Sequence, residues 1–150
     1  MIVVPDATTF LLITQPDHAH LAAEILALWR EADAVGVIEH AWLWDHMVPL
    51  RGPVNAAALE AWTLLAALAV QTDRLQLGVM VTSNRLRYPS VLAKMAATLD
   101  VISEGRLDLG MGAGWFEREF DAYGIPFPPV RDRVSALEES LQVMRAVWPC

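Results

Sequence analysis

The sequence predicts an α/β protein in which a strand followed by a helix occurs four times. Short, largely apolar segments begin near residues 9, 37, 75 and 107, and the first of them is rich in β-branched and aromatic residues. Each is followed by a segment in which apolar residues recur every three or four positions, as they do on one face of a helix. The strand segments are apolar on both faces, which is typical of parallel strands. Their spacing is that of right-handed βαβ units.

The first two units are bounded by clear turn residues. A strand is predicted over Thr9–Thr14 and a helix over Leu21–Val35, with Gly36 ending the helix. The second strand is predicted over Val37–Leu43. A helix over Leu59–Ala69 follows a loop that contains two prolines.

The remaining elements follow the same alternation, and a proline is expected to open the third helix. The predicted strands and helices are Leu75–Val81, Pro89–Ile102, Leu107–Met111, Glu117–Tyr123 and Val134–Val147. No linker or low-complexity segment divides the chain, so residues 1–150 are expected to form a single unit.

Composition excludes several classes of function. The chain has 150 residues, 55% of them hydrophobic and only 19% charged, so disorder is not expected. A net charge of -7 argues against nucleic acid or an anionic membrane surface as a partner. The longest apolar stretch, around Ala61–Val70, is far shorter than the roughly 20 residues of a membrane span. The single cysteine, Cys150, permits no internal disulfide and suggests a cytoplasmic protein.

Two architectures fit this order of elements: an open doubly wound sheet, or part of a (β/α)8 barrel. In both, functional residues lie at the carboxyl ends of the strands. Four segments occupy those positions: Gln15, Trp44-Asp45-His46, Thr82-Ser83-Asn84, and Gly110 to Trp115. They supply an ionisable pair, hydroxyl and amide groups, and a glycine-rich turn that could present backbone N–H groups to a ligand.

Each of these segments also has a structural interpretation. Asp45 could cap the following turn, and His46 could be a hydrogen-bonded histidine at the rim. The glycine-rich turn does not match the G-x-G-x-x-G dinucleotide motif and could be a closely packed strand exit. The sequence contains neither H-E-x-x-H nor G-x-S-x-G, so metal-dependent and serine hydrolysis are not expected and no metal site is predicted.

Five motifs in a fixed order resemble a known family. They are W-x-W-D-H at 42–46, T-x-R-x-x-L-G at 72–78, R-x-P with L-A-K at 87–94, L-D-x-I-S-x-G-R at 99–106 and G-A-G-W at 112–115. In this order they resemble the bacterial luciferase-like monooxygenase superfamily, and most closely its deazaflavin (coenzyme F-420)-dependent oxidoreductases. The resemblance extends from Phe10 to Trp148.

The resemblance implies a (β/α)8 TIM barrel that binds FMN or the deazaflavin at its carboxyl-terminal face. The activity that it implies is that of an oxidoreductase or monooxygenase, with hydride transfer between the cofactor and a small-molecule substrate. A complete barrel takes about 250 residues. Residues 1–150, with four βα units, are therefore expected to be the N-terminal half of such a domain.

The resemblance also implies roles for individual residues. Asp45 and His46 match the catalytic acid and imidazole beside the reactive edge of the cofactor ring. The matching cofactor-binding residues are Met80, Val81, Thr82, Ser83, Gly112, Ala113 and Gly114, with a non-prolyl cis peptide at Met80–Val81. Sugar-phosphate dehydrogenases of the family have an acidic glutamate where this chain has Trp115, so that substrate class is not expected here.

Assembly is the last expectation. Four βα units leave two unpaired sheet edges, and the inner face of the sheet is predicted to expose Leu77, Val79 and Leu109. The mean hydropathy of +0.34 is high for a chain of this size. We expect a homo-oligomer, or assembly with a complementary half-barrel, and little or no turnover by the chain alone. A second interface is expected on the Leu59–Val70 and Leu92–Ile102 helices. Alternatives are a half-barrel that acts only by assembly, and one that binds flavin without turnover.

Overall fold

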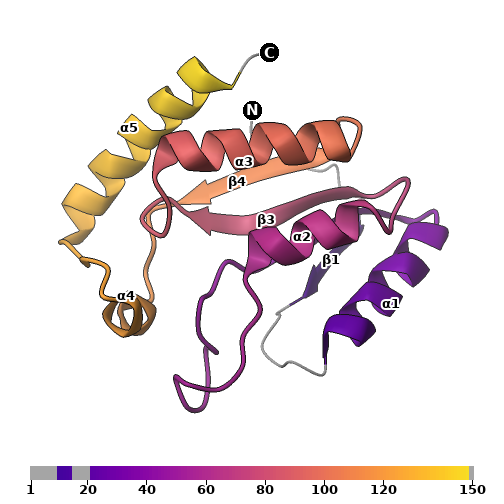
Figure 1. The fold of residues 1–150 in the computed structure, drawn as a ribbon, viewed down its shortest axis with the longest axis horizontal. Helices are drawn as coiled ribbons and strands as arrows, with labels where there is room; N and C mark the ends of the chain where they lie inside the picture. Colours follow the sequence, from indigo (N-terminus) through magenta and orange to yellow (C-terminus); the bar gives the residue numbers. More distant parts are fainter. Residues whose placement is uncertain (1–9, 15–20, 149–150) are drawn as a thin grey trace.

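The computed structural model describes residues 10–14 and 21–148 of the chain. Its centre is a four-stranded sheet, entirely parallel, with the strands in the order of the sequence (Figure 1). The strands are β1 (Phe10–Thr14), β2 (Ile38–Leu43), β3 (Gln76–Ser83) and β4 (Leu107–Gly112). Thr9, the predicted first residue of β1, lies outside the described residues.

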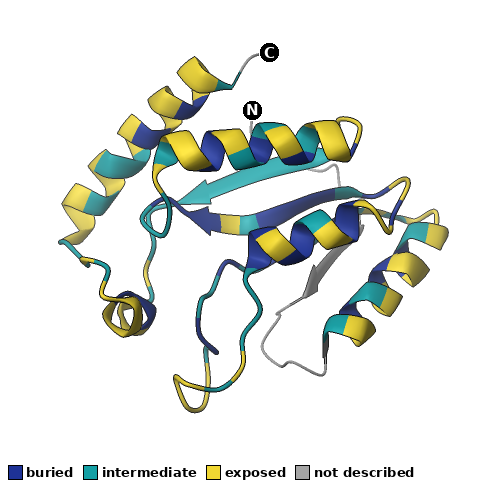
Figure 2. Cartoon of the chain, in the orientation of Figure 1, coloured by how far each residue is buried: buried dark blue, intermediate teal, exposed yellow. Residues whose placement is uncertain are grey.

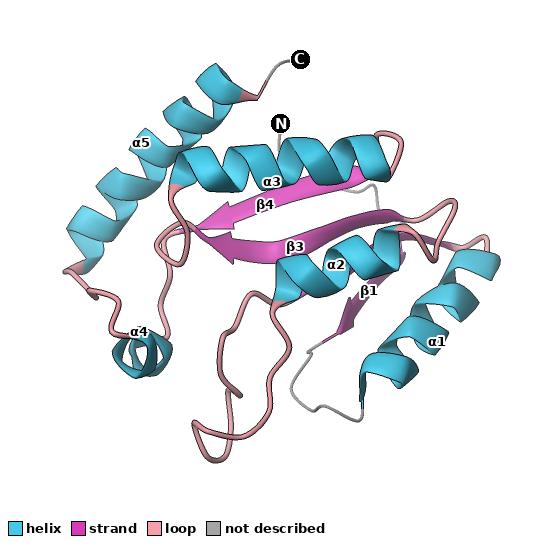
Figure 3. Ribbon diagram, viewed as in Figure 1, coloured by secondary structure: helices cyan, strands magenta, loops and turns pink. Residues whose placement is uncertain are grey.

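Helices follow the strands as predicted. They are α1 (Leu21–Ala34), α2 (Ala61–Ala69), α3 (Pro89–Ile102), α4 (Glu117–Tyr123) and α5 (Val130–Val147). Because consecutive parallel strands are neighbours and their crossovers have one hand, α1, α2 and α3 lie on the same face of the sheet. Figure 3 shows a long loop between β2 and α2. Helix α4, which follows β4, lies on the same side of the molecule as this loop.

The main core lies between the sheet and these helices. Leu43, Leu77 and Val79 are almost completely buried there, against Trp29 of α1 and Leu65 of α2. The prediction that Leu77 and Val79 lie on the uncovered face was therefore wrong. Successive side chains of a strand point to opposite faces, and the odd-numbered residues at the start of β3 are the ones that point toward the helices. Leu109 is partly buried against the same core.

The other face of the sheet carries polar and small residues near its centre. His40 Nδ1 lies 2.6 Å from the Asp108 carboxylate, and the His40 and Trp42 rings are stacked. Gly78 leaves room for the Trp42 ring, because a Cβ atom there would lie 2.6 Å from Trp42 Cζ3. This is the face that would line the inside of a closed barrel.

The structure corrects several predicted boundaries. β3 continues to Ser83, past an irregularity in its pairing with β4 between Val79 and Thr82. The Met80–Val81 peptide in this irregularity is cis, as the resemblance implied. Helix α2 begins two residues later than predicted because the Glu60 side chain accepts hydrogen bonds from the first backbone N–H groups and caps it. α5 begins at Val130, four residues before the predicted Val134.

Four parallel βα units with helices on one face form the architecture of half a (β/α)8 barrel. Within the described part of the chain, none of the helices combines the length and apolar character that a membrane crossing requires. Figure 2 shows β3 as mostly buried, with one exposed interruption near its carboxyl end. That interruption is Val81, which is 48% exposed.

Candidate active site

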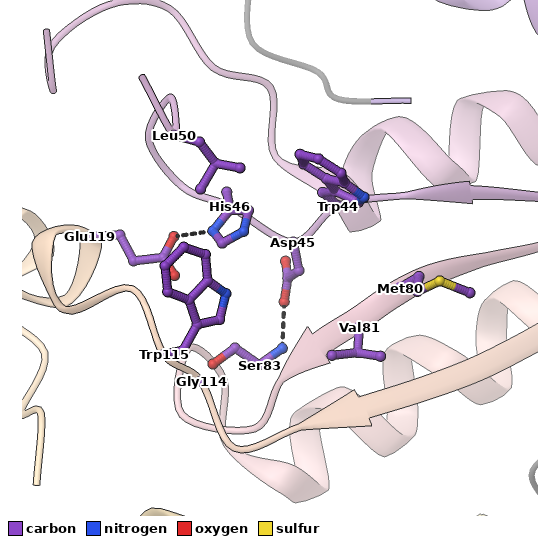
Figure 4. Close-up of a pocket in the computed structure, with 10 residues that line it drawn as sticks. All are labelled: Trp44, Asp45, His46, Leu50, Met80, Val81, Ser83, Gly114, Trp115 and Glu119. Atoms are coloured by element: carbon purple, nitrogen blue, oxygen red, sulfur yellow. Dashed lines mark hydrogen bonds and ion pairs between the residues drawn. The ribbon is translucent and has the colours of Figure 1, made fainter. Parts of the chain in front are cut away.

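A cavity of about 250 Å³ lies at the carboxyl ends of β2, β3 and β4 (Figure 4). Its walls come from the segment after β2, the end of β3 and the turn after β4. The lining residues are Trp44, Asp45, His46, Leu50, Met80, Val81, Ser83, Gly114, Trp115 and Glu119. Two carboxylates, an imidazole and a hydroxyl thus converge on one cavity in the position where α/β enzymes place their sites.

Asp45 is held by a buried network of hydrogen bonds. Its carboxylate accepts two bonds from the Arg87 guanidinium, at 2.8 and 2.9 Å, and one from the Ser83 backbone N–H at 2.9 Å. The Asp45 side chain is only 1% exposed. Arg87 also donates to Glu60, the residue that caps α2. Asp45 therefore ties the ends of β2 and β3 to the starts of α2 and α3.

The same network shifts two pKa values. Burial alone would lower the pKa of Arg87, but its hydrogen bonds to Asp45 and the charges of Asp45 and Glu60 outweigh burial and raise that pKa. Burial alone would raise the pKa of Glu60. The hydrogen bonds from Thr63 and the charge of Arg87 instead hold the pKa of Glu60 below its ordinary value. Both groups are therefore stabilised in their charged forms.

His46 lies between a carboxylate and three aromatic rings. Its Nδ1 atom is 3.2 Å from Glu119 Oε2, and the Glu119 side chain is 1% exposed. The rings of Trp44, Trp115 and Phe116 meet the imidazole edge-on, with centroids 5.6 to 6.4 Å away. These contacts fix the plane of the imidazole, and Figure 4 shows the ring directed into the cavity.

Helix α4 fastens the loop that carries His46. Glu119 Oε2 accepts a hydrogen bond from the Met47 backbone N–H at 3.0 Å, and the Tyr123 hydroxyl donates to the Met47 carbonyl at 3.2 Å. Arg118 donates to the Gly52 carbonyl at 2.8 Å. Residues 46–52 are thereby attached to the element that follows β4, although they lie about 70 residues earlier in the chain.

One wall of the cavity is built around Val81. Gly112 faces it so closely that a Cβ atom there would lie 2.6 Å from Val81 Cγ2, and a Cβ atom on Gly110 would lie 3.2 Å from Val81 Cγ1. The glycines of β4 therefore leave room for this side chain. They allow an exposed apolar residue to project from the sheet toward the cavity.

The turn after β4 is shaped by Gly114, which has a φ of +78°. A Cβ atom there would lie 2.9 Å from Ser83 Oγ and 3.0 Å from the buried Phe120 ring. Arg133 of α5 donates to the Gly114 carbonyl at 3.2 Å and holds the turn from the other side. The Ser83 hydroxyl is buried at the cavity and has no hydrogen-bond partner among the described residues. A ligand that fills the cavity could satisfy it.

The structure brings together six of the nine predicted site residues. Asp45, His46, Met80, Val81, Ser83 and Gly114 line the cavity, whereas Thr82, Gly112 and Ala113 do not. Thr82 is completely buried on the helix side of the sheet, where its hydroxyl accepts a hydrogen bond from the Trp62 indole at 3.2 Å. Thr82 therefore does not line the cavity, and its contact with a cofactor stays a prediction. Gln15 lies outside the described residues.

Sequence reasoning missed the charged partners of the two predicted catalytic residues. Arg87 belongs to the R-x-P motif, and Glu119 lies in the helix predicted after the glycine-rich turn. No local pattern indicates that Arg87 reaches Asp45 or that Glu119 reaches His46. These pairs are separated by 42 and 73 residues and depend on the way the strand ends converge.

A larger depression of about 520 Å³ lies between α2 and α3. It is lined mainly by apolar side chains of the two helices, such as Trp62, Val91 and Met95, with Lys94 as its charged residue. It lies on the helix layer, away from the strand ends, and its lining contains no acid or imidazole. For this reason we regard the smaller cavity as the candidate active site.

The fold and the site together define one half of a parallel α/β barrel with a cavity at the carboxyl ends of its strands. The family model described as luciferase-like monooxygenase matches residues 7–149, and the chain belongs to this family. This confirms the resemblance found in the sequence.

Curated relatives include deazaflavin enzymes. The chain is 34% identical over 120 residues to a protein named F420-dependent glucose-6-phosphate dehydrogenase from Amycolatopsis mediterranei (strain U-32). The match covers 78% of this chain and 35% of the relative. A protein of the same name from Kineococcus radiotolerans is 37% identical, with 74% of this chain and 33% of the relative covered. The chain therefore spans about a third of the length of these relatives.

Solved structures with bound cofactors share the fold. An F420-dependent secondary alcohol dehydrogenase, in complex with an F420-acetone adduct, superposes with a TM-score of 0.79 and 26% identity. The superposition covers 95% of this chain and 42% of the chain of that structure. A type II Baeyer-Villiger monooxygenase from Pseudomonas putida, in complex with FMN, gives a TM-score of 0.78 at 26% identity, with 95% and 40% covered. The relatives are thus F420- or FMN-dependent oxidoreductases and monooxygenases.

Proposed function

We propose that the cavity at the strand ends is the ring-binding part of a deazaflavin or FMN site. We propose further that the chain is the N-terminal half of an oxidoreductase that acts on a small organic substrate. One observation carries this proposal. The same cavity contains an exposed apolar side chain, Val81, and a buried Ser83 hydroxyl that has no hydrogen-bond partner among the described residues. The cofactor, when bound, would supply hydride transfer.

The residues fit a flat ring better than a complete cofactor. Trp44, Met80, Val81 and Trp115 offer apolar surface, and Ser83 offers a hydroxyl to a polar ring edge. The cavity volume of about 250 Å³ is below the roughly 300–1,000 Å³ of most ligand pockets. The described residues that line it include no lysine or arginine to bind a phosphate. The phosphate-binding residues would therefore lie elsewhere in a complete barrel.

Different residues of the chain would have different roles at this site. His46, directed into the cavity, would hold or relay a proton near the reactive ring edge. Asp45, whose carboxylate is occupied by Arg87 and Ser83, would position the end of β2 rather than exchange protons itself. The glycine-rich turn would approach the cofactor with backbone groups, so Gly112, Ala113 and Gly114 stay candidate cofactor residues.

The substrate class follows from the mouth of the cavity. Trp115 is 67% exposed and lines the cavity. The resemblance implies that sugar-phosphate dehydrogenases of the family have a glutamate at this position. An indole there favours an apolar organic substrate over a sugar phosphate. We also propose a cytoplasmic location, for which the cysteine content is the support.

Replacing Val81 tests the assignment of the cavity. Val81→Glu places a charged, longer side chain on the proposed ring wall, and we expect binding of FMN and of the deazaflavin to be lost. The measurement is quenching of tryptophan fluorescence on titration, because Trp44 and Trp115 line the cavity. Val101→Glu is the control, since Val101 is 79% exposed on α3 and distant from the strand ends. Equal cofactor affinity of both variants would contradict the proposal.

Assembly forms the second part of the proposal. β1 and β4 are the edge strands of the sheet, and the inner face around Trp42 and Val81 has no described element over it. We propose that a second copy or a complementary half-barrel covers this face. The α2–α3 depression, whose lining includes the exposed Val91 and Ile102, is proposed as a further interface between copies. A half-barrel that acts only through such assembly is the alternative to an enzyme half.

Sedimentation velocity of the purified chain tests this part. We expect concentration-dependent self-association and weak or absent turnover with either cofactor, because an uncovered apolar face and two open sheet edges favour association. A stable monomer that binds a cofactor at micromolar concentration and turns over would contradict the half-barrel account. An inactive monomer that acquires activity on addition of the second half of a related barrel would support the enzyme over the alternative.

A further inference from the structure

We propose that Glu119 is a positioning residue that sets the protonation pattern of His46, so that neutral His46 carries its hydrogen on Nδ1 and presents Nε2 to the cavity as a proton acceptor. This inference rests on the proposed function, because it concerns the imidazole to which that function assigns a proton. It concerns a residue that the sequence did not suggest and whose effect on proton transfer would be exerted through His46.

The two hydrogen bonds at one oxygen atom decide which group donates. Glu119 Oε2 lies 3.0 Å from the Met47 backbone nitrogen and 3.2 Å from His46 Nδ1. The Met47 N–H can only donate, so Oε2 must accept from it. An oxygen that carries a proton is a poor acceptor, so Oε2 is the unprotonated oxygen of the carboxyl group. The bond to His46 is therefore a donation from Nδ1–H to Glu119.

This donation determines the state of the other ring nitrogen of His46, Nε2. A neutral imidazole has one N–H and one bare nitrogen, so a hydrogen on Nδ1 leaves Nε2 as the acceptor. The groups packed around the ring are the aromatic side chains of Trp44, Trp115 and Phe116. Among the described residues Nε2 has no hydrogen-bond partner, and Figure 4 shows this nitrogen on the side of the ring away from Glu119.

A purely structural role for Glu119 is the competing explanation. The carboxylate could serve only to fasten the loop to α4 through the Met47 N–H, and the His46 contact would then be incidental. The two explanations differ in their consequences for the ring. If Glu119 sets the protonation pattern, its loss changes the tautomer of His46, whereas fastening the loop through Met47 carries no such consequence.

The test is nitrogen NMR of the full chain labelled with ¹⁵N-histidine, with the His46 signals assigned by comparison with His46→Gln. At a pH where the ring is neutral, we expect the Nδ1–H tautomer, with Nε2 at the strongly downfield shift of a bare nitrogen. Glu119→Gln retains an oxygen that can accept both bonds and should keep this tautomer. Glu119→Leu should lose it, and Glu117→Gln, at an exposed acid of the same helix, should leave it unchanged.

Two outcomes would overturn the inference. One is a wild-type His46 that carries its hydrogen on Nε2, a result that requires no variant to fold. The other is a folded Glu119→Leu variant with the wild-type tautomer. Neither outcome depends on cofactor binding, so failure of this inference is distinct from failure of the Val81→Glu titration. A correct tautomer in a chain that binds no cofactor would support the pairing of Glu119 with His46 while contradicting the proposed function.

Discussion

Arg87→Met is expected to destabilise the chain by about 3–5 kcal/mol, which is the cost of removing one partner of a buried ion pair. The substitution keeps much of the aliphatic side chain but leaves the Asp45 carboxylate, 1% exposed, with only the Ser83 N–H as partner among the described residues. It also removes the cation beside Glu60. A domain of this size has a total unfolding free energy of roughly 5–15 kcal/mol, so the variant should lose much of its resistance to urea.

Urea denaturation of Arg131→Met provides the matched control. Arg131 is exposed on α5, and its replacement should change the unfolding free energy by no more than about 0.5 kcal/mol. Equal stability of the two variants would show that the hydrogen-bond network around Asp45 contributes nothing to the unfolding free energy.

The same network gives the wild type an acid dependence. The pKa of Glu60 is lowered in the folded state, so its contribution to stability is present above its ordinary value near 4.5 and is lost as the pH falls through the folded value. Glu60→Gln should flatten this part of the profile of unfolding free energy against pH.

Gly78→Ala is the second substitution with a large expected effect. A Cβ atom at this position would lie 2.5 Å from the Asp108 carbonyl oxygen and 2.6 Å from the Trp42 ring. The first neighbour is backbone of the adjacent strand, which cannot move away without disturbing the pairing of β3 with β4. We expect a loss of about 1–3 kcal/mol, the usual cost of overpacking, measured by thermal or urea unfolding.

Gly36→Ala separates this steric effect from the general effect of replacing glycine. A Cβ atom on Gly36 would meet no atom of the described residues within 4 Å, and the φ of this residue is not positive. Its replacement should be neutral or stabilise by up to about 1 kcal/mol, because alanine has less freedom in the unfolded chain. A Gly78→Ala variant as stable as Gly36→Ala would show that the strand can accommodate the added methyl group.

The order and type of the elements could be predicted because hydrophobic periodicity and turn residues are local signals. Gly36 and Pro89 lie at predicted helix ends, and every predicted element that falls within the described residues is present. The orientation of β3 could not be predicted in the same way. A continuous apolar run does not indicate which alternate residues face the helices, so Leu77 and Val79 were placed on the wrong face.

The candidate site was predictable in position but not in its connections. Strand ends in a parallel sheet meet at one edge, so Asp45, His46 and Ser83 could be expected to lie together. Their partners Arg87 and Glu119 are brought to them by the packing of α3 and α4, for which the sequence has no local pattern. The assignment of a catalytic role to His46 stays a prediction, whereas for Asp45, also predicted to be catalytic, we propose a positioning role at the end of β2.

Chemical-shift mapping with ¹H–¹⁵N NMR is the most direct test of the central claim, that the cavity at the strand ends holds the cofactor ring. Deazaflavin and FMN would each be titrated into the labelled chain up to millimolar concentration, so that weak binding by half a barrel is detected. If the cavity holds the ring, the shifts should be concentrated at His46, Val81, Ser83 and Gly114. Shifts concentrated instead at Val91 and the α2–α3 depression, or no shifts at all, would contradict it.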